Sequence, residues 1–193
     1  MNYKKIIPPF EINIKQLQLD FEVISKMEMA QLPFTFYRQI GLTYENENSK
    51  NKFHDAAGSL DLDYENWTIE DAVAGKTPPV STRKLTESDF DKIVPYIKGM
   101  YTYELIENLK KHYNIGRTRF MLMKTKTCLT WHVDSTPRMH IPVFTNERCK
   151  MVWDNGTLTM EDGNLYWVNT TIPHTAFNGG HVDRIHLVMT VEE

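Results

Sequence analysis

The sequence lacks the features that mark several specialised classes of protein. No stretch approaches the roughly 18 apolar residues of a membrane-spanning helix, and the N-terminal MNYKKIIPPFEINIKQ has no apolar run as long as that of a signal peptide. Two cysteines, Cys128 and Cys149, are too few for a disulfide framework, so we expect reduced thiols. A formal net charge of −3 gives no reason to expect nucleic acid or an anionic membrane as a partner. These absences favour a cytoplasmic protein that binds neither nucleic acid nor membrane.

The chain of 193 residues fits a single domain with a proper core, and its character changes near residue 115. Within residues 1–114, the stretch DFEVISKMEMAQ from Asp20 has helical apolar spacing, and residues 85–114 have the pattern of two helices, with Thr86 as an N-cap. The segment from Thr43 to Asp55 is polar and reads as a loop. We expect this N-terminal part to consist of helices and loops that support the functional site, with the segment from Thr43 to Asp55 as a lid.

Residues 115–193 alternate short runs rich in Val, Ile, Thr, Phe, Trp and Met with turn signals. Asn155-Gly156, Asp162-Gly163 and Asn178-Gly179 separate such runs, and these dipeptides between alternating segments favour hairpins. About seven short strands at this spacing predict an antiparallel sandwich or jelly roll, with the preceding helices packed on one sheet. The expected fold class is therefore mainly β with flanking helices.

The tripeptide His-Val-Asp occurs twice, at residues 132–134 and at residues 181–183. Residues two apart on a strand point to the same face, and a mononuclear iron site needs two imidazoles and one carboxylate on one face of the metal. The first copy has a suitable third ligand in His174, which several strands separate from it in the sequence. After the second copy only His186 remains, too near on the same strand, so we interpret that copy as part of a turn.

A further residue and the order of the motifs indicate a family. Arg184 follows His174 by ten residues and opens the last predicted strand, where a guanidinium inside a barrel can hold a carboxylate through two parallel hydrogen bonds. The ordered set WHVD, RMHIPV, GNLYWVN, PHTAFN and RIHLVM resembles the Fe(II)- and 2-oxoglutarate-dependent oxygenases over residues 115–191. Within them it is most similar to the aspartyl/asparaginyl β-hydroxylase-like branch, which also includes bacterial proline hydroxylases. This resemblance implies a double-stranded β-helix core, that is, a cupin-like jelly roll, in residues 115–193.

The resemblance also implies roles for single residues. The implied iron ligands and catalytic residues are His132, Asp134 and His174, and the implied cosubstrate-binding residues are Arg184, for the distal carboxylate of 2-oxoglutarate, with Arg138 and His140. Some relatives have glycine in place of Asp134, and halogenating relatives have a small residue there, so the carboxylate favours hydroxylation. One departure is that the strand MLMKTKTCLT lacks the Tyr and Gly that many relatives carry.

The reaction implied is hydroxylation of an unactivated C–H bond in an amino-acid side chain, with O2 and 2-oxoglutarate consumed and succinate and CO2 formed. The substrate is a free amino acid, or an aspartyl, asparaginyl or prolyl residue in a polypeptide. Two alternatives are a cupin-type metal enzyme that does not use 2-oxoglutarate and a non-catalytic jelly-roll binding module. Arg184 discriminates against the first alternative, because an enzyme without this cosubstrate has no need of a buried arginine at that position.

Overall fold

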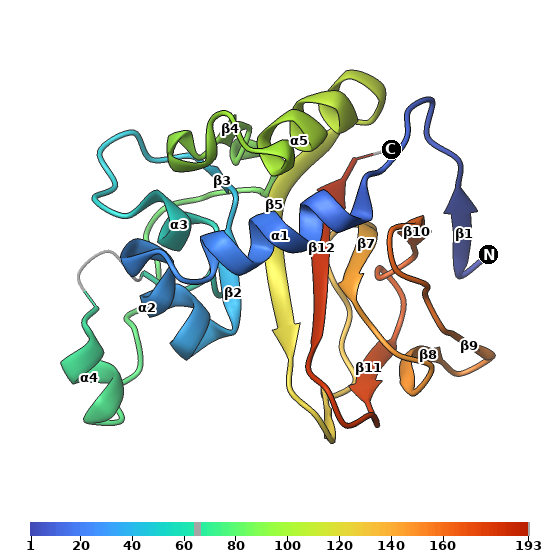
Figure 1. The fold of residues 1–193 in the computed structure, drawn as a ribbon. Coiled ribbons are helices and arrows are strands. Elements are labelled where there is room, and N and C mark those ends of the chain that lie inside the picture. The colour runs from blue at the N-terminus through green and yellow to red at the C-terminus, as the bar shows by residue number, and fades with distance from the viewer. Residues whose placement is uncertain (64–66, 193) are drawn as a thin grey trace.

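The computed structural model describes residues 1–63 and 67–192, and the strands in that part of the chain form three antiparallel sheets (Figure 1). The strands are β1 (Tyr3–Ile6), β2 (Gln39–Gly41), β3 (Thr43–Tyr44), β4 (Lys92–Ile93), β5 (Ile115–Met123), β6 (Thr127–Cys128), β7 (Arg138–Phe144), β8 (Cys149–Trp153), β9 (Gly156–Leu158), β10 (Leu165–Val168), β11 (His174–Asn178) and β12 (Arg184–Val191). The large sheet has the order β1-β10-β7-β12-β5-β2, the small sheet has the order β6-β11-β8-β9, and β3 pairs with β4.

From β5 onward the chain winds back and forth between the large and the small sheet. Strands β5, β7, β10 and β12 belong to the large sheet, whereas β6, β8, β9 and β11 belong to the small one. A shared apolar cluster, which includes Met123 of β5, Trp153 of β8 and Ala176 of β11, shows that the two sheets pack face to face. This winding is that of a double-stranded β-helix, so the predicted mainly β, cupin-like jelly roll is confirmed.

The turn signals of this region have two different roles. Asn155-Gly156 joins β8 to β9 in a hairpin, where Trp153 pairs with Gly156, as the sequence predicts. Asp162-Gly163 and Asn178-Gly179 lie between strands of different sheets, so the prediction of hairpins there is wrong. Gly163 has a positive φ of 73°, a conformation that glycine adopts without strain, and the chain turns there toward β10.

Helices cover the outer face of the large sheet. The helices are α1 (Ile14–Ile24), α2 (Glu28–Tyr37), α3 (Lys52–Asp55), α4 (Ile69–Val73) and α5 (Tyr101–His112), together with the 3₁₀ turns η1 (Glu87–Asp89) and η2 (Pro95–Ile97). Alternate side chains of the sheet, such as Phe120, Ile141 and Leu187, form one buried cluster with Leu17 of α1 and Leu105 of α5. Figure 1 shows α1 crossing this face of the sheet. Among the described residues, no helix is long and apolar enough to cross a bilayer.

The N-terminal part differs from the predicted set of helices and loops. Strands β1 and β2 extend the two edges of the large sheet by pairing with β10 and β5. Residues 85–114 contain one α-helix, α5, and not two, because Pro95 allows only a short 3₁₀ turn and Gly99 takes a φ of 86° just before α5 begins. Thr86 does cap a helical element, but that element is the short η1, through a capping box with Asp89.

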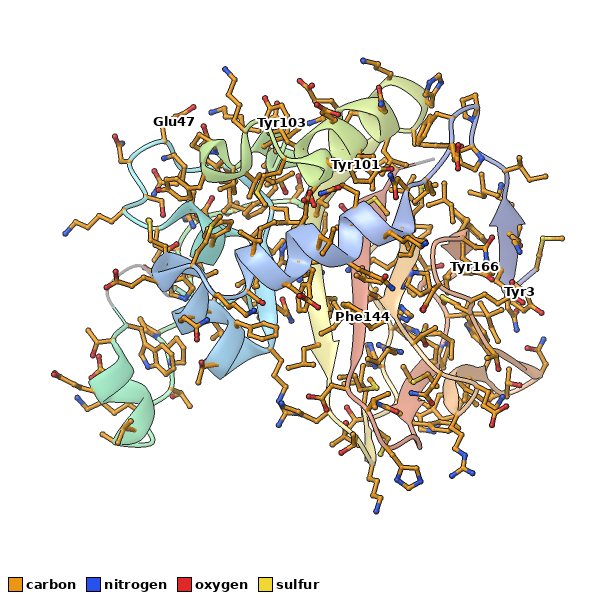
Figure 2. The ribbon with its side chains drawn as sticks, in the orientation of Figure 1. Tyr3, Glu47, Tyr101, Tyr103, Phe144 and Tyr166 are labelled. Atoms are coloured by element: carbon orange, nitrogen blue, oxygen red, sulfur yellow. The ribbon has the colours of Figure 1, made fainter. Side chains whose placement is uncertain are left out.

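A buried carboxylate ties α1 to the start of α5. Asp20 is only 4% exposed, and its Oδ2 accepts hydrogen bonds from the Thr102 backbone N–H at 2.7 Å and the Thr102 hydroxyl at 2.9 Å. The same two helices meet again where the Tyr101 hydroxyl accepts a hydrogen bond from the Asn13 backbone N–H at 2.7 Å. Figure 2 shows Tyr101 where α5 lies beside α1. These contacts fix the angle at which both helices lie on the sheet.

Removing the Asp20 carboxylate is expected to destabilise the fold. In Asp20→Ala the buried amide and hydroxyl of Thr102 lose their acceptor, which costs about 1–3 kcal/mol for each group left unsatisfied. Urea denaturation should show this as a lower free energy of unfolding. Glu22→Ala, at an exposed position of the same helix, is the matched control and should leave the free energy of unfolding almost unchanged. Equal free energies of unfolding for Asp20→Ala and Glu22→Ala would contradict the prediction.

Candidate active site

A cavity of about 740 Å³ opens between the two sheets. Its walls come from inward-facing residues of β5, β7 and β12 on one side and of β8 and β11 on the other. The N-terminal part contributes Gln39 and residues 58–61 and 85–87 to the lining. The segment from Thr43 to Asp55 contains β3 and α3 and contributes none of the described lining residues, and its role as a lid stays a prediction.

Three side chains predicted as metal ligands meet at the wall of this cavity. One ligand atom from each of His132, Asp134 and His174 lies within 4.8 Å of the others. His132 and His174 face each other across an antiparallel bridge in which each backbone N–H donates to the other's carbonyl at 3.0 Å, and their ring centroids are 4.3 Å apart. The Asp134 N–H donates to the Thr170 carbonyl at 2.8 Å, which continues this alignment. This pairing brings His132 and His174 together, although they are 42 positions apart in the sequence.

Both imidazoles are oriented so that Nε2 is free for a metal. Nδ1 of His132 lies 2.8 Å from the Thr130 carbonyl oxygen, and Nδ1 of His174 lies 3.0 Å from that of Ile172. A carbonyl oxygen only accepts, so Nδ1 carries the hydrogen and Nε2 of the neutral ring keeps its lone pair. Burial lowers the pKa of His174, which favours the neutral ring. Two imidazoles and one carboxylate on one face are the ligands of non-haem Fe(II) sites, so the residues present fit this metal.

Arg184 lies deep in the cavity, where none of the described carboxylates contacts it. The residue is 6% exposed, and in the part of the chain that the structure describes its Nε has no hydrogen-bond partner. Burial lowers its pKa to about 10, so the guanidinium is still charged at neutral pH. A buried cation of this kind needs an anion, because an unpaired charge inside a protein is costly. The orphaned guanidinium therefore fits the carboxylate of a bound ligand.

Two buried histidines lie next to Arg184. Nδ1 of His140 is 3.3 Å from Nδ1 of His186, so one ring donates to the other. Burial, together with the charge of Arg184, lowers the pKa of His140 to about 3 and keeps that ring neutral. In the described part of the chain neither Nε2 has a partner. When His186 donates at Nδ1, His140 carries its hydrogen on Nε2 and can donate it to a ligand.

Arg138, predicted to bind a cosubstrate, already has three protein partners. It donates to the Thr136 hydroxyl at 2.7 Å and to Oε1 of Glu87 at 3.0 Å. Its Nε lies 3.3 Å from Oδ2 of Asp134, so it also forms an ion pair with one of the candidate metal ligands. Arg138 therefore holds the Asp134 carboxylate in place before any ligand arrives.

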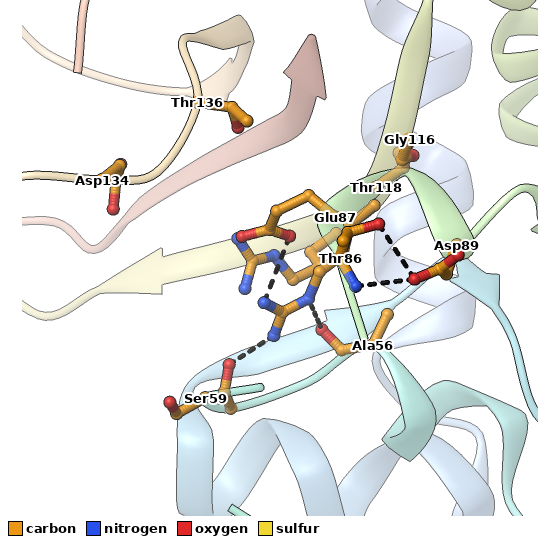
Figure 3. Close-up of polar contacts among 12 residues, drawn as sticks. Ala56, Ser59, Thr86, Glu87, Asp89, Gly116, Thr118, Asp134 and Thr136 are labelled. Carbon is orange, nitrogen blue, oxygen red and sulfur yellow. Dashed lines mark hydrogen bonds and ion pairs between the residues drawn. The ribbon is translucent and has the colours of Figure 1, made fainter. Parts of the chain in front are cut away.

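Glu87 is a functional-site residue that the sequence analysis missed. It is 7% exposed, and it lies between two guanidinium groups, with Oε1 bonded to Arg138 and Oε2 accepting from Arg117 at 3.3 Å (Figure 3). Burial alone would raise the pKa of Glu87, but the charges of Arg117 and Arg138 outweigh burial and lower it. The backbone of η1 packs so tightly on β5 that a Cβ at Gly116 would collide with the Glu87 carbonyl oxygen. The carboxylate is thus fixed beside the cavity.

The second His-Val-Asp copy lies in a turn, as predicted. His181 is exposed, and the Asp183 carboxylate accepts hydrogen bonds from the Lys124 ammonium at 2.9 Å and the Thr125 N–H at 3.0 Å. These bonds close the turn that precedes β12. Asp183 therefore has a structural role in this turn.

The family model for aspartyl/asparaginyl β-hydroxylase matches residues 95–193, just over half of the chain. The chain belongs to this family. The matched segment includes the three candidate ligands and Arg184, and the activity is that of an oxygenase of the hydroxylase type. The family resemblance predicted from the motif order is confirmed. Glu87 lies outside the matched segment of this hydroxylase.

Several solved structures are similar to this hydroxylase over its length or part of it. AviO1 from Streptomyces viridochromogenes Tue57 is 11% identical, with 100% of this chain and 90% of that chain covered and a TM-score of 0.47. The viral collagen prolyl hydroxylase of Paramecium Bursaria Chlorella virus-1 is 9% identical, with 99% and 91% covered and a TM-score of 0.43. A 2OG-Fe(II) oxygenase family oxidoreductase from Burkholderia pseudomallei is 11% identical, with 58% and 60% covered and a TM-score of 0.36. These scores are all below 0.5, so the fold assignment rests on the strand order.

Proposed function

We propose that this hydroxylase uses Fe(II), O2 and 2-oxoglutarate to hydroxylate an unactivated C–H bond of an amino-acid side chain, free or within a polypeptide. The observation that carries the proposal is a pair of features in one cavity. Three ligand atoms of His132, Asp134 and His174 lie within 4.8 Å of one another, and Arg184 has a buried guanidinium whose Nε lacks a partner among the described residues. The first feature suits the metal and the second suits a carboxylate.

The proposal gives each residue a defined task. His132 and His174 bind Fe(II) through Nε2, and Asp134 binds it through a carboxylate oxygen that Arg138 keeps in position. Arg184 and His140 bind the distal carboxylate of 2-oxoglutarate, the first through its charge and the second through an Nε2 hydrogen. When bound, the iron and the cosubstrate supply the oxidising chemistry, in which O2, 2-oxoglutarate and the C–H bond become succinate, CO2 and an alcohol.

The protein's own contribution is binding, orientation and the exclusion of water. The Nδ1 hydrogen bonds of His132 and His174 fix the orientation of both rings, so these two imidazoles and the Asp134 carboxylate would hold the metal at the wall of the cavity. The charged residues Arg138 and Arg184 line the cavity and are buried between the sheets, so their charges interact more strongly than they would in water.

The alternative of a cupin-type metal enzyme without 2-oxoglutarate explains the three ligands equally well. It gives no reason for a guanidinium that is 6% exposed and has an orphaned Nε, because burying such a cation is costly unless a ligand pairs with it. Arg184 therefore favours the cosubstrate-dependent reaction.

Anaerobic addition of Fe(II) and then of 2-oxoglutarate to the purified protein tests the proposal. We expect a weak visible absorption band from the iron–cosubstrate complex that neither addition produces alone. On admission of O2, succinate should form, and compounds that are substrates should increase its rate of formation. Fe(II)-loaded protein that stays colourless with excess 2-oxoglutarate would contradict the proposal and leave the cosubstrate-free enzyme as the better reading.

A further inference from the structure

The guanidinium of Arg138 connects Glu87 to the candidate metal ligand Asp134. Its Nε lies 3.3 Å from Oδ2 of Asp134, and one terminal nitrogen donates to Oε1 of Glu87 at 3.0 Å. The other terminal nitrogen donates to the Thr136 hydroxyl at 2.7 Å. Because all three nitrogens of this planar group have a partner, the guanidinium cannot rotate without losing contacts on three sides. A carboxylate outside the metal site thus helps to fix the group that faces Asp134.

The Asp134 carboxylate depends on Arg138 for its orientation. The side chain of Asp134 is 25% exposed and lines the cavity. Among the described residues, its ionisable neighbours at ion-pair distance are Arg138 at 3.3 Å and the candidate ligand His174 at 3.9 Å. A carboxylate that binds a metal is normally held by a further hydrogen-bonding partner, which keeps its oxygens directed at the metal. Arg138 is placed to be this partner.

Glu87 is held firmly enough to be the fixed end of this chain of contacts. It lies in η1, which a capping box closes, beside the other polar groups that Figure 3 shows. Its Oε2 accepts a hydrogen bond from Arg117, which also donates to the carbonyls of Ala56 and Gly58. Glu87 therefore ties a candidate metal ligand of the jelly roll to the backbone of the N-terminal part.

Stability alone does not account for three buried charges in a row. Arg117, Glu87 and Arg138 are 3%, 7% and 6% exposed, and a buried ion cluster is often no more stable than apolar residues of similar volume. Burial raises the pKa of Glu87, but nearby charges outweigh burial and lower it, so the carboxylate is ionised. These charges belong to Arg117, Arg138 and Arg119, which line the same cavity. The cluster thus keeps a fixed negative charge beside Arg138.

We propose that Glu87 is a positioning residue of the metal site, which acts through Arg138 on the Asp134 carboxylate. Without the charge of Glu87, the guanidinium either closes on Asp134 and competes for its oxygens, or moves off and lets the carboxylate turn. Both changes lower the affinity for Fe(II). Arg138, which the family resemblance assigns to the cosubstrate, thereby serves the metal ligand. The inference rests on the proposed function, because it takes the three candidate ligands as an iron site.

Anaerobic equilibrium dialysis against Fe(II) tests this role. Glu87→Gln should raise the Kd for Fe(II) by at least about fivefold, because loss of a residue that holds a metal ligand costs 10–100-fold and Glu87 acts one contact further out. At saturating Fe(II), the Kd for 2-oxoglutarate from calorimetry should stay within about twofold of the wild-type value, since Arg184 and His140 bind the cosubstrate. Equal increases in both Kd values would indicate general damage and overturn the inference.

A double-mutant cycle shows whether Glu87 acts through Arg138. In the Arg138→Gln background the chain of contacts is already broken, so Glu87→Gln should change the Kd for Fe(II) by less than about twofold. An effect as large as in the wild-type background would mean that Glu87 acts on the metal without Arg138, and it would overturn the inference.

Arg117→Gln is the matched control for a loss of stability. Its Tm should fall, because Glu87 and the carbonyls of Ala56 and Gly58 lose their donor. Glu87 stays bonded to Arg138, so the Kd for Fe(II) should stay within about twofold of the wild-type value. Arg117→Gln that weakens Fe(II) binding as much as Glu87→Gln does would assign the effect to the fold and overturn the inference.

Glu87→Asp provides the test if Glu87→Gln does not fold. It keeps the charge, but its side chain is one methylene shorter and cannot reach Arg138 from the same backbone position, so the Kd for Fe(II) should rise by at least about threefold. An unchanged Kd would overturn the inference.

The outcomes also separate the inference from the proposed function. Wild-type protein that binds Fe(II) no more tightly than His174→Ala overturns the iron site and the inference with it. Wild-type protein that binds Fe(II) more tightly than His174→Ala, together with a Glu87→Gln variant of unchanged Kd, overturns the inference alone.

Discussion

His174→Ala should lower the affinity for Fe(II) by more than about 100-fold, because loss of a residue that only orients a metal ligand already costs 10–100-fold. His174 is the candidate ligand that β11 contributes, and the centroid of its ring lies 4.3 Å from that of the His132 ring. Without it, only His132 and Asp134 of the proposed set would remain to hold Fe(II). Equilibrium dialysis against Fe(II) measures the affinity, and both the visible band and succinate formation should disappear.

The second His-Val-Asp copy provides the control for this prediction. His181→Ala changes the same residue type in the same tripeptide, but at an exposed turn position. Its iron affinity and its visible band should equal those of the wild type. If His181→Ala lost iron as His174→Ala does, the assignment of the metal site to the first copy would be wrong.

Arg184→Met should raise the Kd for 2-oxoglutarate by about 30-fold to 5,000-fold, because truncating one partner of a buried charge pair costs about 2–5 kcal/mol. Methionine keeps much of the side-chain volume, so the cavity wall stays intact. Calorimetric titration of the cosubstrate into Fe(II)-loaded protein measures this change. The affinity for Fe(II) itself should hardly change, since Arg184 lies on β12 and the three proposed metal ligands come from other segments.

An exposed arginine gives the matched comparison for Arg184. Arg148 lies in the turn before β8, and Arg148→Met should bind 2-oxoglutarate as the wild type does. An Arg184→Met variant with wild-type cosubstrate affinity would remove the main support for the 2-oxoglutarate-dependent reaction. An Arg184→Met variant that loses iron as well would contradict the separate roles given to Arg184 and His174.

The candidate ligands could be found from the sequence because local geometry determines them. Residues two apart in an extended segment face the same way, so His132 and Asp134 form half of a site wherever the fold places them. The distance from the first copy to His174, and from His174 to Arg184, then pointed to these two residues. The alternation and turn signals of residues 115–193 predicted a sandwich or a jelly roll, and the family resemblance implied the jelly roll. The pairing of His132 with Asp134 and the alternation of the strands depend on neighbours in the sequence, which a single chain displays directly.

Glu87, Arg117 and Arg119 could not be found in this way. In IGRTRFM the two arginines alternate with other residues, a pattern that an ordinary strand with one solvent-exposed face also shows. Arg117 and Arg119 are only 3% and 6% exposed, because η1 and residues 58–61 cover that face of the strand. Strands β1 and β2 were missed because they are short and gain their stability from pairing with distant strands.

The contact between η1 and β5 has a consequence for how such an enzyme can be rebuilt from parts. Glu87 lies outside the segment that the family model matches, yet it is linked through Arg138 to the Asp134 carboxylate inside that segment. A graft of residues 95–193 onto a foreign N-terminal part would leave two guanidinium groups without their shared carboxylate. Such a chimera needs an acidic residue at the place of Glu87 in its N-terminal part, packed against Gly116 of the grafted segment. The segment that contains Glu87 must therefore be transferred together with residues 95–193.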